Sequence, residues 1–322
     1  MLVQDLKLSI VIPTKNRAEM LRGVLRSIAG QKADQNIYEV IVIDNGSTDE
    51  TKTVPEEFRG KIQNLRYIYD ERPGLHTGRN RGIIESRGEL IGYLDDDVVL
   101  FPDWVNTVIR AFDDVEVMRV CGSVVPYDMS LMTAEFMSRH AVKIGSYWFV
   151  GAISCFWERG ISENDMRTHR MKENLVVGAN TVFRKKILYM CAGFHPDGMP
   201  RNLLMYRGDG ESYIGQFMYE HKMRSMYYAQ ASVYHMIDVS RVNSSYISYM
   251  YFRNGISGMY TVLRDGGWRK GFKYLGSILS GNNLKLLVDE DTRHTVLGEI
   301  YLLAYYIFYP RVRRWVHKKS YF

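Results

Sequence analysis

Short apolar runs alternate with helix-like segments over the first 125 residues, and this alternation restricts the folds open to the chain. Residues 8–12 are a continuous β-branched run that Pro13 ends, and residues 38–43 are a second such run. Runs of this kind indicate strands buried on both faces. Between them apolar residues recur at helical spacing, and Asn16 with Glu19 predicts a capping box. Further strands are predicted at 65–69, 90–94 and 117–125, and further helices at 77–86 and 102–112.

Alternating strands and helices predict an α/β fold with a mostly parallel sheet flanked by helices. The second half is less regular. Residues 157–174 are highly charged and lack periodicity, which predicts a long loop. Apolar patterns predict strands at 175–183 and 227–234, the latter ended by His235, and a helix at 211–223. From about residue 239 the chain is rich in tyrosine and predicts a helical C-terminal extension.

Composition narrows the class of protein further. With 322 residues, 46% of them hydrophobic, the chain can bury the core of one large domain or two modest ones. The net charge of +6 gathers partly near the C-terminus and not in a nucleic-acid-binding motif, so no nucleic-acid partner is expected. Cys121, Cys155 and Cys191 are too far apart for a zinc site or a disulfide framework, which predicts reduced thiols in a cytoplasmic protein. Neither a signal peptide nor a transmembrane run is expected.

Three consecutive carboxylates, Asp95, Asp96 and Asp97, follow the apolar run at 90–94. Adjacent like charges repel one another, and burial strengthens the repulsion. A divalent cation relieves it, and Mn²⁺ or Mg²⁺ commonly binds one or two carboxylates together with substrate phosphates. The triplet therefore predicts a metal site for a diphosphate-bearing substrate, with a solvated acidic turn as the alternative.

Two other polar motifs stand at ends of the predicted elements. Asp44 and Asn45 follow the second strand, where they can bind a nucleobase or ribose, or form an ordinary Asx turn. Arg79 stands between Gly78 and Gly82 in a segment expected to open a helix. A helix N-terminus with an arginine predicts a phosphate site, and a solvated basic face is the alternative. Together, the strand ends offer contacts for a base, a phosphate and a metal.

The ordered set of motifs resembles family-2 glycosyltransferases with the GT-A fold. The resemblance covers roughly residues 6–238 and continues through segments 178–184, 191–194, 208–211 and 233–235. It implies metal ligation by Asp97, Asp95 and His235, a capped strand end being the alternative for the histidine. The positions that it implies for donor binding are Pro13, Thr14, Lys15, Asn16, Arg17, Asp44, Asn45, Arg79, Asp95 and Asp96.

The same resemblance places a catalytic base in an acidic pair at the start of a helix, here Asp209 and Glu211. An inverting transfer needs such a carboxylate to take the proton from the acceptor hydroxyl. Asp209 is favoured because it aligns best with the family's acidic pair, although Gly208 stands at the pair's first position. Lys15 and Asn45 replace residues common in the family at the base-binding site. A UDP-sugar is the default donor, and thymidine or guanosine diphosphate sugars stay open.

The resemblance implies residues 1–125 as a nucleotide-sugar-binding half, 126–238 as an acceptor-binding half and 239–322 as a helical region. Residues 300–309 are apolar and aromatic and 311–319 are basic, a pattern typical of helices that lie on anionic membranes. A helix packed on the catalytic domain is the alternative. We expect a cytoplasmic enzyme, with a peripheral location on the inner face of the plasma membrane left open. The acceptor would be a saccharide or lipid-linked saccharide used in cell-surface polysaccharide synthesis.

Two competing functions are weighed against this one. A sugar-phosphate nucleotidyltransferase needs a similar sheet and metal, but it would carry a glycine-rich loop after the first strand, where this chain has Thr14 to Arg17. A non-catalytic nucleotide-sugar-binding module would lack the aspartate triplet or the acid at 209–211, and both are present.

Overall fold

The computed structural model describes residues 6–172, 175–280 and 288–321. The chain divides into two compact units: residues up to 194 together with 211–237, and residues 195–210 together with 238–321. Positions 173–174 of the predicted loop, 281–287 and 322 of the predicted helical region, and 1–5 lie outside the described residues.

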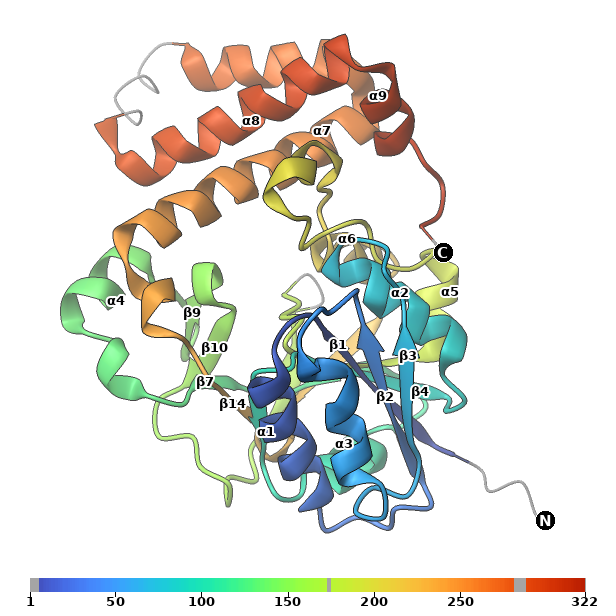
Figure 1. The fold of residues 1–322 in the computed structure, drawn as a ribbon. Helices are drawn as coiled ribbons and strands as arrows, with labels where there is room; N and C mark the ends of the chain where they lie inside the picture. Colours follow the sequence, from blue (N-terminus) through green and yellow to red (C-terminus); the bar gives the residue numbers. More distant parts are fainter. Residues whose placement is uncertain (1–5, 173–174, 281–287, 322) are drawn as a thin grey trace. The chain divides into compact units, whose positions relative to one another are not determined.

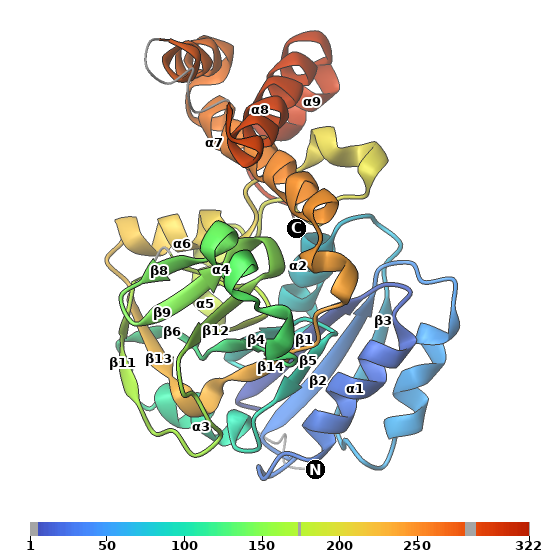
Figure 2. The same ribbon diagram turned by 90° about the vertical axis from the view of Figure 1, so that its left-hand side faces the viewer.

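An eight-stranded mixed sheet forms the centre of the first unit, in the order β11-β13-β6-β12-β4-β1-β2-β3 (Figure 2). β1 pairs in parallel with both β2 and β4, as the alternating sequence pattern predicts. β12 is antiparallel to its neighbours β4 and β6. The strands of this sheet are β1 (Leu8–Thr14), β2 (Tyr38–Asp44), β3 (Leu65–Tyr69), β4 (Leu90–Leu94), β6 (Val117–Cys121), β11 (Thr168–Met171), β12 (Asn180–Arg184) and β13 (Arg224–Tyr228).

A second sheet in the same unit has six shorter strands, in the order β5-β14-β7-β10-β9-β8. Its strands are β5 (Val98–Leu100), β7 (Val124–Pro126), β8 (Val142–Ile144), β9 (Tyr147–Val150), β10 (Cys155–Glu158) and β14 (Val233–His235). The helices of the unit are α1 (Ala18–Ala29), α2 (Leu75–Glu85), α3 (Trp104–Ala111), α4 (Ala134–His140), α5 (Lys185–Met190) and α6 (Glu211–Glu220). Shorter 3₁₀ segments are η1 (Glu50–Phe58), η2 (Met129–Leu131), η3 (Gly151–Ile153) and η5 (Ala229–Ala231).

The core of the first unit lies between the large sheet and the helices α2, α5 and α6. β1, β2 and β4 are buried along their whole length, as continuous apolar strands should be. Gly82 lets α2 approach β1 closely, because a Cβ there would stand 2.3 Å from Cγ1 of Val11. The strand ends that carry the polar motifs are thereby fixed on a rigid scaffold.

The second unit is helical (Figure 1). α7 (Ser244–Leu279) and α8 (Glu290–Phe308) pack along each other, and α9 (Pro310–Val316) follows, with η4 (Arg201–Tyr206) and η6 (Val239–Val242) as 3₁₀ segments. The helical extension was predicted from residue 239, but residues 195–210 also belong to this unit. The reason is polar pairing with α7, since Arg207 donates to Ser257 Oγ at 3.0 Å and Thr261 donates to Asp209 at 2.8 Å. Within the described residues, no helix is long and apolar enough to cross a membrane.

Three local predictions were wrong in position. Asn16 does not cap α1; it adopts φ 53°, and its side chain accepts a hydrogen bond from the backbone N–H of Thr48 at 2.7 Å. α2 begins at Leu75 after Gly74, whose φ of 108° suits glycine, so Gly78 and Arg79 lie inside the helix and do not open it. Arg79 therefore cannot be part of a helix N-terminal phosphate site.

Two predicted segments are divided. Residues 117–125 form β6 and β7 in different sheets, because the chain crosses between sheets at Gly122, where a Cβ would stand 2.1 Å from the carbonyl oxygen of Ala231. Residues 227–234 likewise contain the end of β13, a 3₁₀ turn and β14.

The predicted loop at 157–174 contains β11, which pairs with β13. The strand predicted over 175–183 begins only at Asn180.

Candidate active site

Polar residues meet at the carboxyl ends of three parallel strands. Thr14 ends β1 and lies beside Asp44, which ends β2, while Asp95 follows β4 directly. Parallel strands place their carboxyl ends at one edge of the sheet, where ligands of open α/β folds bind. The structure thus brings together Thr14, Arg17 and the aspartate triplet, which are among the positions implied for donor and metal binding.

The triplet is held by hydrogen bonds to the end of β1 and the loop after it. Thr14 donates its hydroxyl to Oδ2 of Asp96 at 2.7 Å, and Nε of Arg17 lies 3.3 Å from the other oxygen. Nη2 of Arg17 donates to Oδ2 of Asp97 at 2.7 Å. Asp96 and Asp97 are both buried. Because the side chain of Arg17 is 40% exposed, one face of the cluster reaches solvent.

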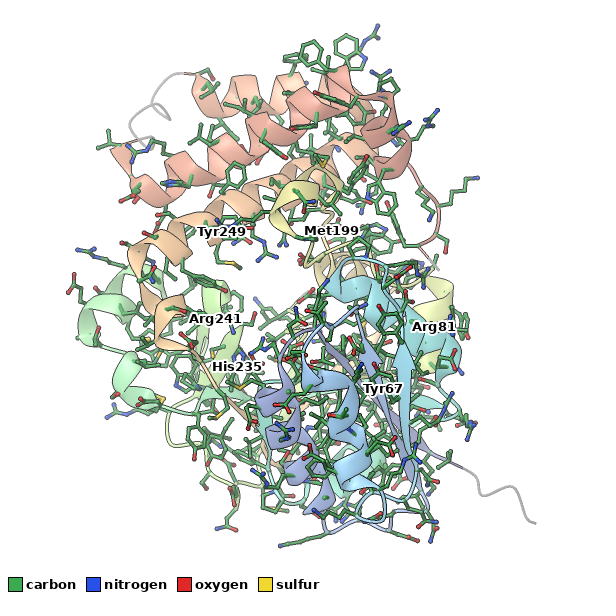
Figure 3. The ribbon with its side chains drawn as sticks, viewed as in Figure 1. Tyr67, Arg81, Met199, His235, Arg241 and Tyr249 are labelled. Carbon is green, nitrogen blue, oxygen red and sulfur yellow. The ribbon has the colours of Figure 1, made fainter. Side chains whose placement is uncertain are left out.

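His235 faces Asp97 from the other sheet. β14 runs antiparallel to β5 and pairs His235 with Val98, the residue after Asp97. The backbone N–H of Met236 donates to the carbonyl of Asp97 at 2.8 Å. As a result Nε2 of His235 lies 3.1 Å from Oδ1 of Asp97, and Nδ1 lies 3.6 Å from Sγ of Cys155. His235 is labelled in Figure 3. The pairing of β14 with β5 therefore brings together His235 and Asp97, which are 138 positions apart in the sequence.

The electrostatics of this cluster favour a bound cation. Burial, with the opposing charge of Arg17 and the like charge of Asp97, leaves the pKa of Asp96 raised to about 7. Three carboxylates so close together cannot all ionise without cost. Oδ1 of Asp97 and Nε2 of His235 are buried, face each other, and offer the oxygen and imidazole donors that Mn²⁺ accepts. Asp97 and His235 therefore fit a divalent ion.

Arg79 lies beneath Asp95 and is itself almost fully buried. Its Nη2 donates to Oδ1 of Asp95 and to the carbonyl of Gly178, each at 2.9 Å. The family resemblance implied that Arg79 helps to hold the nucleotide. In the structure its guanidinium contacts Asp95, whose side chain is 24% exposed.

Glu211 joins this network from the start of α6. Its Oε2 lies 3.6 Å from Nη1 of Arg79 and 3.0 Å from Nε2 of His76. Burial opposes ionisation of Glu211, but the hydrogen bond from His76 and the charge of Arg79 hold its pKa below the usual value. An ionised carboxylate, one arginine away from Asp95, is therefore part of the same cluster.

Asp209 has a different environment, inside the second unit. Oδ1 lies 2.6 Å from Nδ1 of His195, and Oδ2 accepts from Thr261 and Arg264, each at 2.8 Å. Burial disfavours its charge, yet the bond from His195 and the charge of Arg264 lower its pKa. Both carboxylate oxygens are engaged by neighbours of that unit. The acidic pair of the sequence is thus divided between two units.

The residues predicted to bind the base are placed unequally. Asp44 is fully buried, and its two oxygens accept from the N–H of Ser47 at 2.7 Å and from the hydroxyl of Tyr67 at 2.8 Å. These bonds match the Asx turn weighed as the alternative. Asn45 is buried under α2, where a Cβ on Gly78 would stand 2.5 Å from Oδ1 of Asn45.

Of the remaining donor-binding predictions, Pro13 is buried in β1 while Lys15 and Asn16 are exposed beside it. The sequence prediction missed His76, which is fully buried against Arg79 and Glu211. No local pattern singles it out, because its partner on α6 is 135 positions away. A histidine in the first turn of a glycine-capped helix was the only available sign.

Comparisons with known proteins agree with this architecture. The chain resembles the crystal structure of Staphylococcus aureus TarS 1–349 in complex with UDP-GlcNAc, with TM-score 0.57, 14% identity, and coverage of 96% of this chain and 84% of that one. It also resembles the mannosyltransferase PcManGT from Pyrobaculum calidifontis in complex with GDP-Man and Mn²⁺, with TM-score 0.52, 15% identity, and coverage of 97% and 84%. At these identities the likeness establishes the fold, which is that of GT-A glycosyltransferases.

The sequence profile of Glycosyl transferase family 2 matches residues 9–190, more than half of the chain. The chain therefore belongs to glycosyl transferase family 2. Glycosyltransferase AglE of Haloferax volcanii is 34% identical over 117 residues, 36% of this chain and 38% of that protein. A Campylobacter jejuni GalNAc(5)-diNAcBac-PP-undecaprenol beta-1,3-glucosyltransferase is 31% identical over 106 residues, 32% of this chain and 34% of that protein. The match thus spans less than two fifths of each of these relatives.

Proposed function

We propose that this protein transfers a sugar from a nucleotide diphosphate, by preference a UDP-sugar, to a hydroxyl of a saccharide or lipid-linked saccharide. The transfer is inverting, depends on Mn²⁺ or Mg²⁺, and serves the synthesis of a cell-surface polysaccharide or glycan. Residues 1–125 bind the donor, and 126–238 contribute to acceptor binding. One observation carries the proposal: three carboxylates follow β4, with Asp97 Oδ1 facing His235 Nε2 at 3.1 Å.

In this proposal Asp97 and His235 hold the divalent ion, with Asp95 beside it. The bound ion would neutralise charge that develops on the departing diphosphate. Arg17, whose side chain is 40% exposed, remains within reach of the diphosphate, while Thr14 keeps Asp96 in place. Lys15 and Asn16 line the exposed end of β1 where donor phosphate or base would pass. Asp44 and Asn45 act on the base-binding loop by fixing its backbone.

We assign the catalytic base to Glu211 and not to Asp209, which the sequence favoured. Glu211 shares Arg79 with Asp95, whereas both oxygens of Asp209 are engaged by His195, Thr261 and Arg264. In the reaction the acceptor O–H proton passes to Glu211 as the acceptor oxygen bonds to the anomeric carbon. The anomeric carbon–oxygen bond then breaks, and its electron pair leaves with the nucleoside diphosphate.

The ligands and acceptors named for similar proteins support the proposed substrate class. One structural neighbour binds UDP-GlcNAc, another binds GDP-Man with Mn²⁺, and one curated relative has an undecaprenol-linked acceptor in its name. A UDP-sugar and a lipid-linked saccharide are therefore the first substrates to try. A GDP-sugar is the second choice of donor.

The test of this function is binding of UDP-GlcNAc, UDP-glucose and GDP-mannose with and without Mn²⁺, on the wild type and on Asp97→Ala. We expect one donor to bind the wild type only with Mn²⁺, and we expect this Mn²⁺-dependent binding to be lost in Asp97→Ala. Slow release of nucleoside diphosphate without acceptor would then separate an enzyme from a binding module. Binding that ignores both the metal and Asp97 would overturn the proposal.

We further propose that the helical unit contacts an anionic membrane. α8 exposes apolar side chains as well as burying them: Leu297 is 48% exposed, Ile300 43% and Phe308 75%. The following residues Arg311 and Arg314 are exposed and basic. A helix with an apolar outer face next to basic residues is typical of binding to an anionic bilayer surface.

Vesicle sedimentation tests this contact independently of catalysis. We expect the protein to bind vesicles of phosphatidylglycerol and phosphatidylcholine and to lose most binding in the Leu297→Ser/Phe308→Ser double variant. The matched control is Ile84→Ser, since Ile84 is 52% exposed on α2 of the other unit. Equal vesicle binding by the wild type, the double variant and Ile84→Ser would show that α8 is not the contact surface.

A further inference from the structure

His76 is a fully buried histidine that the proposed reaction does not use directly. It lies in the first turn of α2, and its ring packs on Phe194 with centroids 5.0 Å apart. Nε2 of His76 lies 3.0 Å from Oε2 of Glu211 and 2.7 Å from Nη1 of Arg79. A buried imidazole is thus placed directly on the carboxylate assigned as the base.

The local sequence explains why His76 points there. Gly74 supplies the left-handed residue that starts α2, and His76 and Arg79 are three residues apart, so both lie on one face of the helix. Gly178 leaves the space that this face needs, because a Cβ there would stand 2.4 Å from Nη1 of Arg79 and 2.7 Å from Oε1 of Glu211. The three side chains occupy one close-fitting cradle.

We propose that His76 is a positioning residue that, with Arg79, fixes the Glu211 carboxylate for proton abstraction from the acceptor hydroxyl. The inference rests on the proposed role of Glu211. Both groups lie near Oε2, so the rotation of the carboxylate is restricted. Arg79 also contacts Asp95, so the base and the aspartate triplet share one anchor. A general base must lie within hydrogen-bond reach of its proton, and a displacement of about 1 Å can cost about 100-fold in rate.

The test compares His76→Leu, which fills the site without a hydrogen bond, with His76→Gln, which keeps an N–H donor. Turnover of the donor that binds the wild type, from UDP-GlcNAc, UDP-glucose and GDP-mannose, is measured with Mn²⁺. We expect His76→Leu to lower kcat about 100-fold while donor Kd stays within about twofold. His76→Gln should recover most of kcat. His169→Leu is the control, since His169 is bonded to Tyr147 and not to Glu211.

The outcomes separate this inference from the proposed function. If Glu211→Gln lowers kcat but His76→Leu does not, Glu211 remains the base and His76 is only part of the core. If Glu211→Gln keeps wild-type kcat, the assignment of the base fails and this inference fails with it. Thermal unfolding of each variant checks folding. Should His76→Leu fail to fold, His76→Asn replaces it, because the shorter amide does not reach Oε2; equal kcat in the Asn and Gln variants would overturn the proposal.

Discussion

Two buried aspartate–histidine pairs in this protein look alike but have opposite electrostatic surroundings. Asp97 faces His235 at 3.1 Å in the first unit, and Asp209 faces His195 at 2.6 Å in the second. Asp209 also accepts hydrogen bonds from Arg264 and Thr261, so its negative charge is balanced within its own unit. Asp97 stands in a row of three carboxylates and shares Arg17 with Asp96. Removing one partner of a balanced buried pair destabilises a fold, whereas a cluster with excess negative charge is suited to a cation.

The largest expected difference between the two pairs is the effect of removing the Asp97 carboxylate on turnover. We expect Asp97→Ala to reduce metal-dependent turnover about 1000-fold, since a bound ion supplies several kcal/mol of charge stabilisation. Removing one carboxylate from the crowded cluster should leave the melting temperature unchanged or raised. Turnover against Mn²⁺ concentration and thermal unfolding measure the two effects. A variant that unfolds while keeping its metal dependence would mean that Asp97, like Asp209, is structural.

Glu211 tests whether the base belongs to the cluster of the first unit. Glu211→Gln keeps the size of the side chain but cannot accept the proton, so kcat should fall about 100- to 10,000-fold with donor binding nearly unchanged. Asp209→Asn is the matched control and should keep most of kcat. Steady-state kinetics with purified variants decides between them. A larger loss in the Asp209 variant would reverse our assignment.

Asp209→Ala should act on stability. It removes the carboxylate that pairs with Nδ1 of His195 and with Nη1 of the part-buried Arg264, and breaking such a buried pair costs about 3 kcal/mol. Urea unfolding should therefore show a clear loss, while Mn²⁺ binding at the first unit stays as in the wild type. Glu220→Ala, an exposed acid on α6, is the control with little expected effect. A loss of Mn²⁺ binding in Asp209→Ala would contradict the separation of the two pairs.

The smallest expected effect is on the pH dependence of stability. Because the folded-state pKa of Asp209 is lowered, its stabilising contribution is complete above the unfolded value of about 3.9 and disappears as pH falls through the folded value. The difference in melting temperature between the wild type and Asp209→Asn should thus be constant near pH 6 and shrink below about pH 4. A difference that grew on acidification would show that the folded-state pKa is raised.

Helix ends and sheet changes were predicted less well than strands. β1, β2, β3 and β4 were predicted within a residue or two. For β1 and β2 the reason is that continuous β-branched runs are typical of strands buried on both faces. The helix α2 was predicted from residue 77, whereas it begins at Leu75, directly after Gly74. Residues 117–125 look like one strand, yet Gly122 lets the chain change sheets against Ala231. Such a crossing depends on a neighbour more than a hundred residues away.

The sequence by itself predicted the class of site, because an apolar strand that ends in Asp95, Asp96 and Asp97 places three like charges together and so favours a cation. It also indicated His235 and an acid at 209–211. Only the tertiary structure distinguished the surroundings of the two acids, by bringing Glu211 to Arg79 and His76 and placing Asp209 against Arg264. The physical reason is that strand propensity and charge repulsion act between neighbours in sequence, whereas the partner that neutralises or orients a buried carboxylate is chosen by packing.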